Sequence, residues 1–225
     1  MITIQNLEFS YGKSPVIKNL NWQLETGRIH GLVGLNGAGK STLFNLMAGW
    51  LKPLNGTILY NGIRLDRSIC ALMETNPQFY PMIKGQEYLD VFKLKNDLFD
   101  IEAWNKIFKL PLNEVVDNYS TGMKKRLDLM GILAMNREIL ILDEPFNGLD
   151  FEAVRLLQQV LPLLASRGKT IIISSHITES LTSVCHSISL LRNGEIGLKI
   201  ESEMFGQIIE MIDFHGEIKT EEFPF

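Results

Sequence analysis

Residues 34–41 decide the fold of this chain, and they read Gly34-Leu35-Asn36-Gly37-Ala38-Gly39-Lys40-Ser41. Two glycines separated by four residues and followed by Lys and Ser form the pattern of a phosphate-binding loop. The apolar run 29–33 precedes the loop, and a helical run that begins at Thr42 follows it. This strand, loop and helix order is the context that the pattern requires, whereas a chance glycine turn capping a helix would not need it. The sequence therefore predicts a site for a nucleoside triphosphate.

Each part of this loop has a predicted chemical task. Glycines allow main-chain N–H groups to turn toward an anion, and the start of the following helix adds partial positive charge. We expect Lys40 to reach the β- and γ-phosphates, Ser41 to hold Mg²⁺, and Thr42 to bind further back on the triphosphate. The predicted nucleotide-binding residues of the loop are Gly34, Asn36, Gly37, Ala38, Gly39, Lys40, Ser41 and Thr42.

Two other apolar runs end in residues that suit phosphate chemistry. Asp143 and Glu144 follow the run 139–142, where Asp143 can hold Mg²⁺ through water and Glu144 can accept a proton from an attacking water. His176 follows the run 171–173 and two serines, and it can bind the γ-phosphate. We predict Lys40, Glu144 and His176 as catalytic residues. The alternatives are a solvated loop acid for Glu144 and a structural histidine for His176; the remaining histidines, His30, His186 and His215, are predicted to be structural.

Hydrophobic patterning predicts the layers around this site. Alternating apolar residues near the N-terminus, together with Asn-Gly pairs at 55–56 and 61–62, predict antiparallel strands and hairpin turns. The fully apolar runs predict buried parallel strands. Helical spacing fills residues 83–135, and a helix over 152–167 begins after a possible N-cap at Asp150, with Pro162 expected to kink it.

The predicted fold class is therefore α/β. It has a phosphate-loop NTPase core with a mainly parallel sheet, an N-terminal antiparallel β layer and an inserted helical lobe. We expect one domain over 1–225, with the ATPase core at about 1–75 and 137–200 and the lobe at about 76–136. A C-terminal helix and tail are expected over 201–225, on the spacing of Phe205, Ile208, Ile209 and Ile212.

Composition excludes several classes of protein. Lys and Arg total 22 and Asp and Glu 26, and the net charge of −4 argues against a nucleic-acid partner. The longest apolar run, 129–135, is too short to cross a bilayer, and no secretory signal is expected. Cys70 and Cys185 lack metal-ligand spacing and are predicted to be free buried thiols in a reducing cytosol.

Residues 118–127 read Asn-Tyr-Ser-Thr-Gly-Met-Lys-Lys-Arg-Leu and resemble the signature of the ATP-binding-cassette (ABC) ATPases. The resemblance extends from about Ile4 to Ile200. It implies a head-to-tail dimer in which each of two ATP molecules lies between one chain's phosphate loop and the other chain's signature. Ser120 and Gly122 would then bind the γ-phosphate, Tyr11 would stack on adenine, and Asp150 would contact the opposite chain. The residues alone leave open a helix N-cap for Ser120 and simple packing on a sheet for Tyr11.

Two departures from the family pattern make the resemblance to one branch of the family more specific. Tyr119, Thr121 and Met123 replace residues of the usual signature Leu-Ser-Gly-Gly-Gln. Glu74 stands where the family has a glutamine that touches Mg²⁺ and the attacking water, so we predict Glu74 as a metal ligand. Its alternative position is the solvated mouth of a groove, facing a basic residue of a permease. Both departures resemble the branch that exports bacitracin, lantibiotics and related compounds.

The leading functional hypothesis is an ATPase that drives a separate integral membrane permease, acting as a homodimer or with a paired ATPase subunit. It would sit at the cytoplasmic face of the membrane. The alternative is a compact soluble ABC ATPase for macromolecular assembly, for example of iron–sulfur clusters. Coiled-coil members are excluded because only 80 positions separate Lys40 from Ser120. Residues 79–83 either pack in the core or line a groove for a permease helix.

Overall fold

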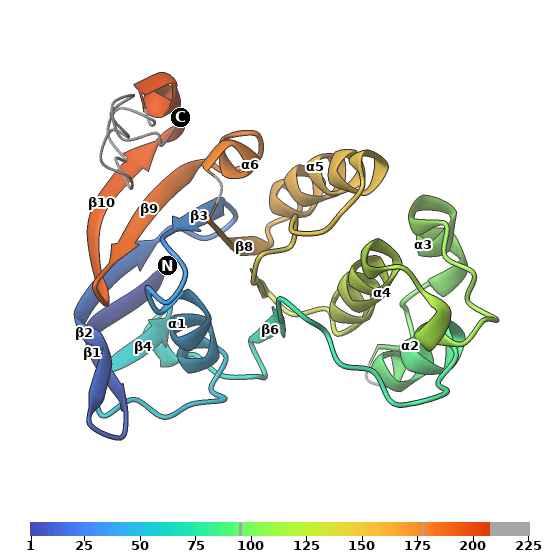
Figure 1. Cartoon of the computed structure of the whole chain (residues 1–225), viewed down its shortest axis with the longest axis horizontal. Coiled ribbons are helices and arrows are strands. Elements are labelled where there is room, and N and C mark those ends of the chain that lie inside the picture. Colours follow the sequence, from blue (N-terminus) through green and yellow to red (C-terminus); the bar gives the residue numbers. More distant parts are fainter. Residues whose placement is uncertain (95, 177, 208–225) are drawn as a thin grey trace, which may run out of the picture.

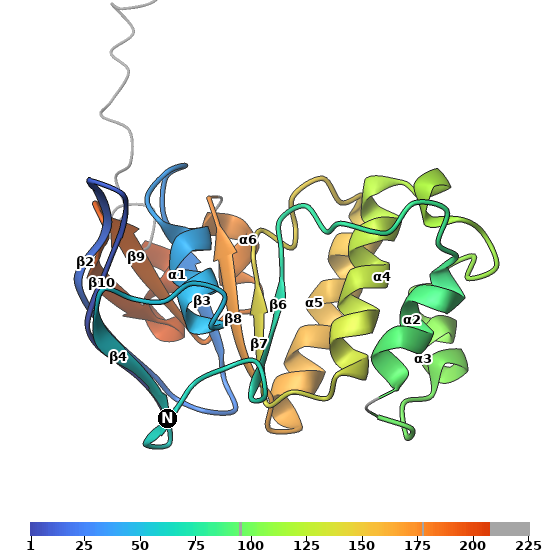
Figure 2. The same ribbon diagram turned by 90° about the horizontal axis from the view of Figure 1, so that it is seen from below.

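The structure is a computed structural model, and it describes residues 1–94, 96–176 and 178–207. Two sheets and a helical lobe make up this part of the chain (Figure 1). The larger sheet has the strand order β10-β9-β3-β8-β7-β6, and the smaller one the order β2-β1-β4-β5. The larger sheet lies between the smaller sheet and the lobe, which confirms the predicted fold class (Figures 1 and 2).

The six-stranded sheet is parallel except at one edge. Its strands are β3 (Ile29–Val33), β6 (Cys70–Met73), β7 (Ile139–Leu142), β8 (Thr170–Ser175), β9 (Ser187–Arg192) and β10 (Glu195–Glu201). Only β10 runs antiparallel to its neighbour, and β3, β7 and β8 are buried along their whole length. Alternate residues of these strands enter two cores: Leu140 and Leu142 face the lobe, whereas Ile139 and Ile141 face the antiparallel layer. Burial on both faces explains the uniformly apolar runs.

The antiparallel layer consists of β1 (Ile2–Tyr11), β2 (Ser14–Leu24), β4 (Asn55–Tyr60) and β5 (Ile63–Arg64). The pair Asn61-Gly62 makes the predicted hairpin turn, with φ of 49° and 82°. The pair Asn55-Gly56 does not, because both residues lie within β4 and pair with β1. Gly56 has φ 85°, and a Cβ there would lie 2.3 Å from the carbonyl oxygen of Asn6. Close approach of two strands, rather than a turn, requires this glycine.

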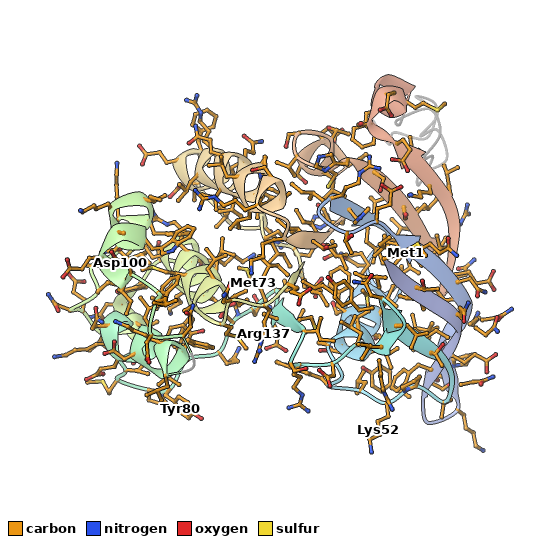
Figure 3. The ribbon with its side chains drawn as sticks, turned by 180° about the vertical axis from the view of Figure 1, so that it is seen from behind. Met1, Lys52, Met73, Tyr80, Asp100 and Arg137 are labelled. Atoms are coloured by element: carbon orange, nitrogen blue, oxygen red, sulfur yellow. The ribbon has the colours of Figure 1, made fainter. Side chains whose placement is uncertain are left out.

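The helical lobe contains α2 (Gly85–Lys93), α3 (Ile101–Phe108), the 3₁₀ helix η1 (Val116–Asn118) and α4 (Thr121–Ala134). The predicted patch 79–83 divides in two: Phe79 and Ile83 pack against the core, whereas Tyr80 and Met82 are 81% and 72% exposed. Figure 3 shows Tyr80 pointing outward at the rim of the lobe. Core packing is therefore correct for Phe79 and Ile83, and the groove for a permease helix stays a prediction.

Three further helices flank the parallel sheet, namely α1 (Lys40–Met47), α5 (Phe151–Ser166) and α6 (Thr178–Thr182). Asp150 caps α5 as predicted, because its Oδ1 accepts a hydrogen bond of 2.8 Å from the Ala153 N–H. Helix α5 includes Pro162 and continues to Ser166. The 3₁₀ helix η2 (Ser202–Gln207) contains Phe205; Ile208, Ile209, Ile212 and His215 lie outside the described residues. No helix in the described ranges is both long and apolar enough to cross a bilayer.

Candidate functional site

A cavity of about 590 Å³ lies at the carboxyl ends of β3, β7 and β8. This edge is where open parallel sheets bind ligands. Most of the predicted site residues converge on the cavity. Its lining consists of Tyr11, Val16, Asn36, Gly37, Gly39, Lys40, Ser41, Thr42, Thr75, Glu144, Asn147 and His176.

The phosphate loop connects buried strand β3 directly to α1. Gly37 and Gly39 have φ of 81° and 106°, which L side chains rarely adopt. At Gly34 a Cβ would lie 2.7 Å from the carbonyl oxygen of Leu191, so the loop also needs glycine for close packing. Lys40 curls back over the loop, and its Nζ donates a hydrogen bond of 2.7 Å to the Gly34 carbonyl. The loop thus aims a helix N-terminus and a buried ammonium group at the cavity.

The carboxylate of Asp143 accepts hydrogen bonds from three hydroxyl groups. Ser41 Oγ and Thr75 Oγ1 donate to its Oδ2 over 2.6 and 3.0 Å, and Ser174 Oγ donates to its Oδ1. Ser174 in turn accepts a 2.9 Å hydrogen bond from the Glu144 N–H. Thr75 and Ser174 were not predicted as site residues, although each directly follows a predicted strand or apolar run. Their arrangement leaves an oxygen-only cluster beside the phosphate loop.

Glu144 lies at the centre of a second set of contacts. Its carboxylate lies 3.4 Å from Lys40 Nζ and 3.0 Å from His176 Nδ1, and its side chain is only 10% exposed. Since a carboxylate oxygen only accepts hydrogen bonds, the ring hydrogen of His176 must sit on Nδ1. Glu144 has φ 50°, a left-handed conformation that is uncommon outside glycine. The three predicted catalytic residues therefore meet in one place.

Five predicted nucleotide-binding residues are absent from the described lining of this cavity; two of them, Gly34 and Ala38, belong to the phosphate loop itself, and the other three lie elsewhere. Ser120, Gly122 and Asp150 instead lie near one another: a Cβ on Gly122 would lie 3.9 Å from Asp150 Oδ2 and 4.0 Å from Ser120 Oγ. Ser120 also caps α4, accepting a hydrogen bond of 3.2 Å from the Met123 N–H. The helix N-cap and the ligand-facing serine are compatible, because the capping bond uses only one of the hydroxyl's positions.

Tyr11 and Glu74 lie at the margins of the site. Tyr11 is 54% exposed, lines the cavity and meets Phe9 edge-on at a ring distance of 4.9 Å. Glu74 lines an adjoining cavity together with Ser41 and Asp143, and its neighbour Thr75 is the residue that touches the Asp143 carboxylate.

Glu74 also faces the lobe. There it helps to raise the pKa of Asp128 to about 6, although burial of the Asp128 carboxyl group is the larger cause.

The structural histidines and thiols are as predicted where they are described. His30 is buried between Ser187 Oγ at 2.9 Å and the Glu25 carbonyl at 2.8 Å, and burial lowers its pKa to about 4. His186 Nδ1 accepts a hydrogen bond of 3.0 Å from the Ile29 N–H. Cys70 and Cys185 are free and buried.

These features define a phosphate-loop ATPase that carries a helical lobe. Residues 17–147 match the ABC transporter family, and the chain belongs to that family. It is therefore an ATP-binding and ATP-hydrolysing subunit of the ABC transporter type, and this class is better supported than the assembly ATPase.

Among curated relatives, the chain is 31% identical to the lantibiotic transport ATP-binding protein SrtF of Streptococcus pyogenes, over 99% of both chains. It is 32% identical to the bacitracin transport ATP-binding protein BcrA of Enterococcus faecalis, covering 87% of this chain and 68% of that protein. Among solved structures, it matches an ATP-binding subunit of an ABC transporter with a TM-score of 0.83 and 26% identity, over 92% of this chain and 93% of that one.

Proposed function

We propose that this chain powers a separate integral membrane permease that exports a peptide antibiotic or a related compound. The names of SrtF and BcrA support this assignment, as does the acidic residue at position 74. In this proposal the chain is one ATP-binding domain that sits at the cytoplasmic face of the membrane through its permease. The observation that carries its chemistry is the convergence of Lys40, Glu144 and His176 on one cavity.

The donor set at Asp143 fits Mg²⁺. Ser41 and Asp143 offer a hydroxyl and a carboxylate 2.6 Å apart. Mg²⁺ in nucleotide sites is held by one or two such groups together with phosphates and water. When bound there, Mg²⁺ would neutralise charge on the β- and γ-phosphates. Glu74 is proposed to approach it from the adjoining cavity when two chains close on the nucleotides.

The residues of the cavity have separate roles in the proposed mechanism. Lys40 binds the β- and γ-phosphates, and a triphosphate in the cavity competes with Glu144 for its ammonium group. Glu144 accepts the proton of the attacking water. His176, hydrogen-bonded through Nδ1, keeps the carboxylate in place, and with a second ring hydrogen on Nε2 it also donates to the γ-phosphate. Tyr11 stacks on adenine at the exposed end of the cavity.

The cluster of Ser120, Gly122 and Asp150 is proposed to complete the site of a second copy. Ser120 and Gly122 lie at the N-terminus of α4, where N–H groups and the helix dipole favour an anion, and Asp150 lies close to both. Because the cluster is absent from the described lining of the chain's own cavity, its ligand would be the nucleotide of the partner. Two copies in head-to-tail arrangement would satisfy both sites at once.

Affinity purification of the full chain from native membranes tests the transport assignment. We expect a polytopic membrane protein to co-purify, and cells lacking either protein to lose tolerance to a bacitracin-like or lantibiotic peptide. Recovery of soluble assembly factors in its place, with unchanged tolerance, would support the assembly ATPase instead.

A further inference from the structure

Lys125 is a buried lysine that the site described above does not use. It lies in α4, five residues after Ser120, and is only 4% exposed. Its side chain is absent from the described lining of the nucleotide cavity. A lysine is seldom buried without a specific partner, so its contacts call for an explanation.

The ammonium group of Lys125 donates hydrogen bonds to two main-chain carbonyl groups. Lys125 Nζ donates hydrogen bonds of 2.7 Å to the carbonyl oxygens of both Glu144 and Asn147. These residues bracket the turn between β7 and α5, and the side chains of both line the nucleotide cavity. The ammonium group therefore holds the main chain at both ends of the turn.

The main chain of the turn needs stabilising hydrogen bonds at Glu144. Its φ of 50° lies in the left-handed region, which costs about 1 to 2 kcal/mol for a residue with a side chain. The Glu144 N–H is held by Ser174 Oγ and its carbonyl by Lys125 Nζ, so both sides of this residue's main chain are fixed. Burial lowers the pKa of Lys125, while the negative charges of Glu144 and Asp143 act in the opposite direction.

We propose that Lys125 is a positioning residue for ATP hydrolysis: its ammonium fixes the turn 144–147 and ties the signature helix α4 to the main chain of Glu144. The inference rests on the proposed role of Glu144 as proton acceptor. Since Ser120 on the same helix serves the partner's nucleotide in that proposal, one ammonium links each chain's signature helix to the main chain of its own Glu144. A displacement of α4 by the partner's nucleotide would then reach Glu144 directly.

The test replaces Lys125 by methionine, which has similar length and no donor. We expect Lys125→Met to lower kcat by about tenfold or more and to change KM and the ATP Kd by less than about twofold. Lys169→Met is the matched control, because Lys169 Nζ also bonds a main-chain carbonyl, that of Arg137 at 2.7 Å, near the opposite ends of the strands. It should alter Tm without altering kcat.

A double-mutant cycle with Glu144→Gln makes the test decisive. If Lys125 acts through Glu144, Lys125→Met should slow single-turnover hydrolysis by less than about twofold in the Glu144→Gln background. An equal fall in both backgrounds, or a parallel loss of ATP affinity, would overturn the inference. Wild-type turnover by Glu144→Gln alone would instead refute the proposed function. Should the methionine variant misfold, Lys125→Gln, which keeps amide donors, enters the same cycle with the same criterion.

Discussion

Asp128 carries its carboxyl group into the lobe, where Tyr88 donates a hydrogen bond of 2.7 Å to it. Burial raises its pKa from 3.8 to about 6, so folding favours the protonated form and the ionised form destabilises the native state above that pH. The penalty is absent below about pH 4 and grows to about 3 kcal/mol above pH 6. We predict that the unfolding free energy of Asp128→Asn, relative to wild type, rises across this window. Urea titrations at pH 4, 5, 6 and 7 measure it; parallel pH curves for the two proteins would contradict it.

The charge of Glu74 leads to a second prediction for a single residue. A carboxylate beside the metal would attract Mg²⁺ and repel the γ-phosphate, and each pair of unit charges contributes about 4 kcal/mol at 4 Å and an effective dielectric of 20, so the two effects largely offset. Direct contact with Mg²⁺ would tip this balance, so we predict that Glu74→Gln needs a higher Mg²⁺ concentration for half-maximal ATPase rate. Titration of the rate with Mg²⁺ at saturating ATP measures it. Equal midpoints would exclude metal contact and favour a permease-facing Glu74.

At the scale of elements, the N-terminus of α4 is predicted to act on a second chain. Ser120→Arg should abolish hydrolysis but leave ATP binding to the monomer unchanged, because Ser120 is absent from the described lining of the chain's own cavity. Fluorescence titration with ATP, beside a phosphate-release assay, separates the two effects.

Asp100→Ala is the control for the lost helix cap, since Asp100 caps α3 in the same way with a 2.9 Å bond from the Ala103 N–H. This control should hydrolyse ATP normally. Equal loss of ATP affinity in Ser120→Arg would mean that Ser120 acts within its own chain.

The helices and strands also show which structural features the sequence pattern can predict. The apolar runs, the helical spacing in 83–135 and the cap at Asp150 depend on local periodicity, and all three were predicted correctly. The Asn55-Gly56 turn was predicted wrongly because this position needs glycine for its close approach to strand β1, and not for a turn. The contacts of Thr75, Ser174 and Lys125 could not be predicted, since each depends on which strand or helix packs beside Asp143 or Glu144.

At the scale of the whole molecule, ATP hydrolysis in the proposed mechanism requires two chains. One chain brings Lys40, Glu144 and His176 to its cavity, whereas Ser120 and Gly122 face elsewhere. Figures 1 and 2 show α4 within the lobe, on the other side of β6 and β7 from α1 and the antiparallel sheet. Catalysis and dimerisation should therefore be separable by a change that removes only the proton acceptor.

Glu144→Gln is that change, and its behaviour with MgATP tests whether Glu144 is the proton acceptor of a two-chain site. The amide keeps the shape of the side chain but cannot accept the proton, so hydrolysis should fall by about 10²- to 10⁴-fold while ATP still binds. Size-exclusion chromatography with light scattering, run beside a phosphate-release assay, measures both properties. We predict an ATP-bound dimer with little turnover; wild-type turnover, or a variant that stays monomeric with ATP bound, would contradict this mechanism.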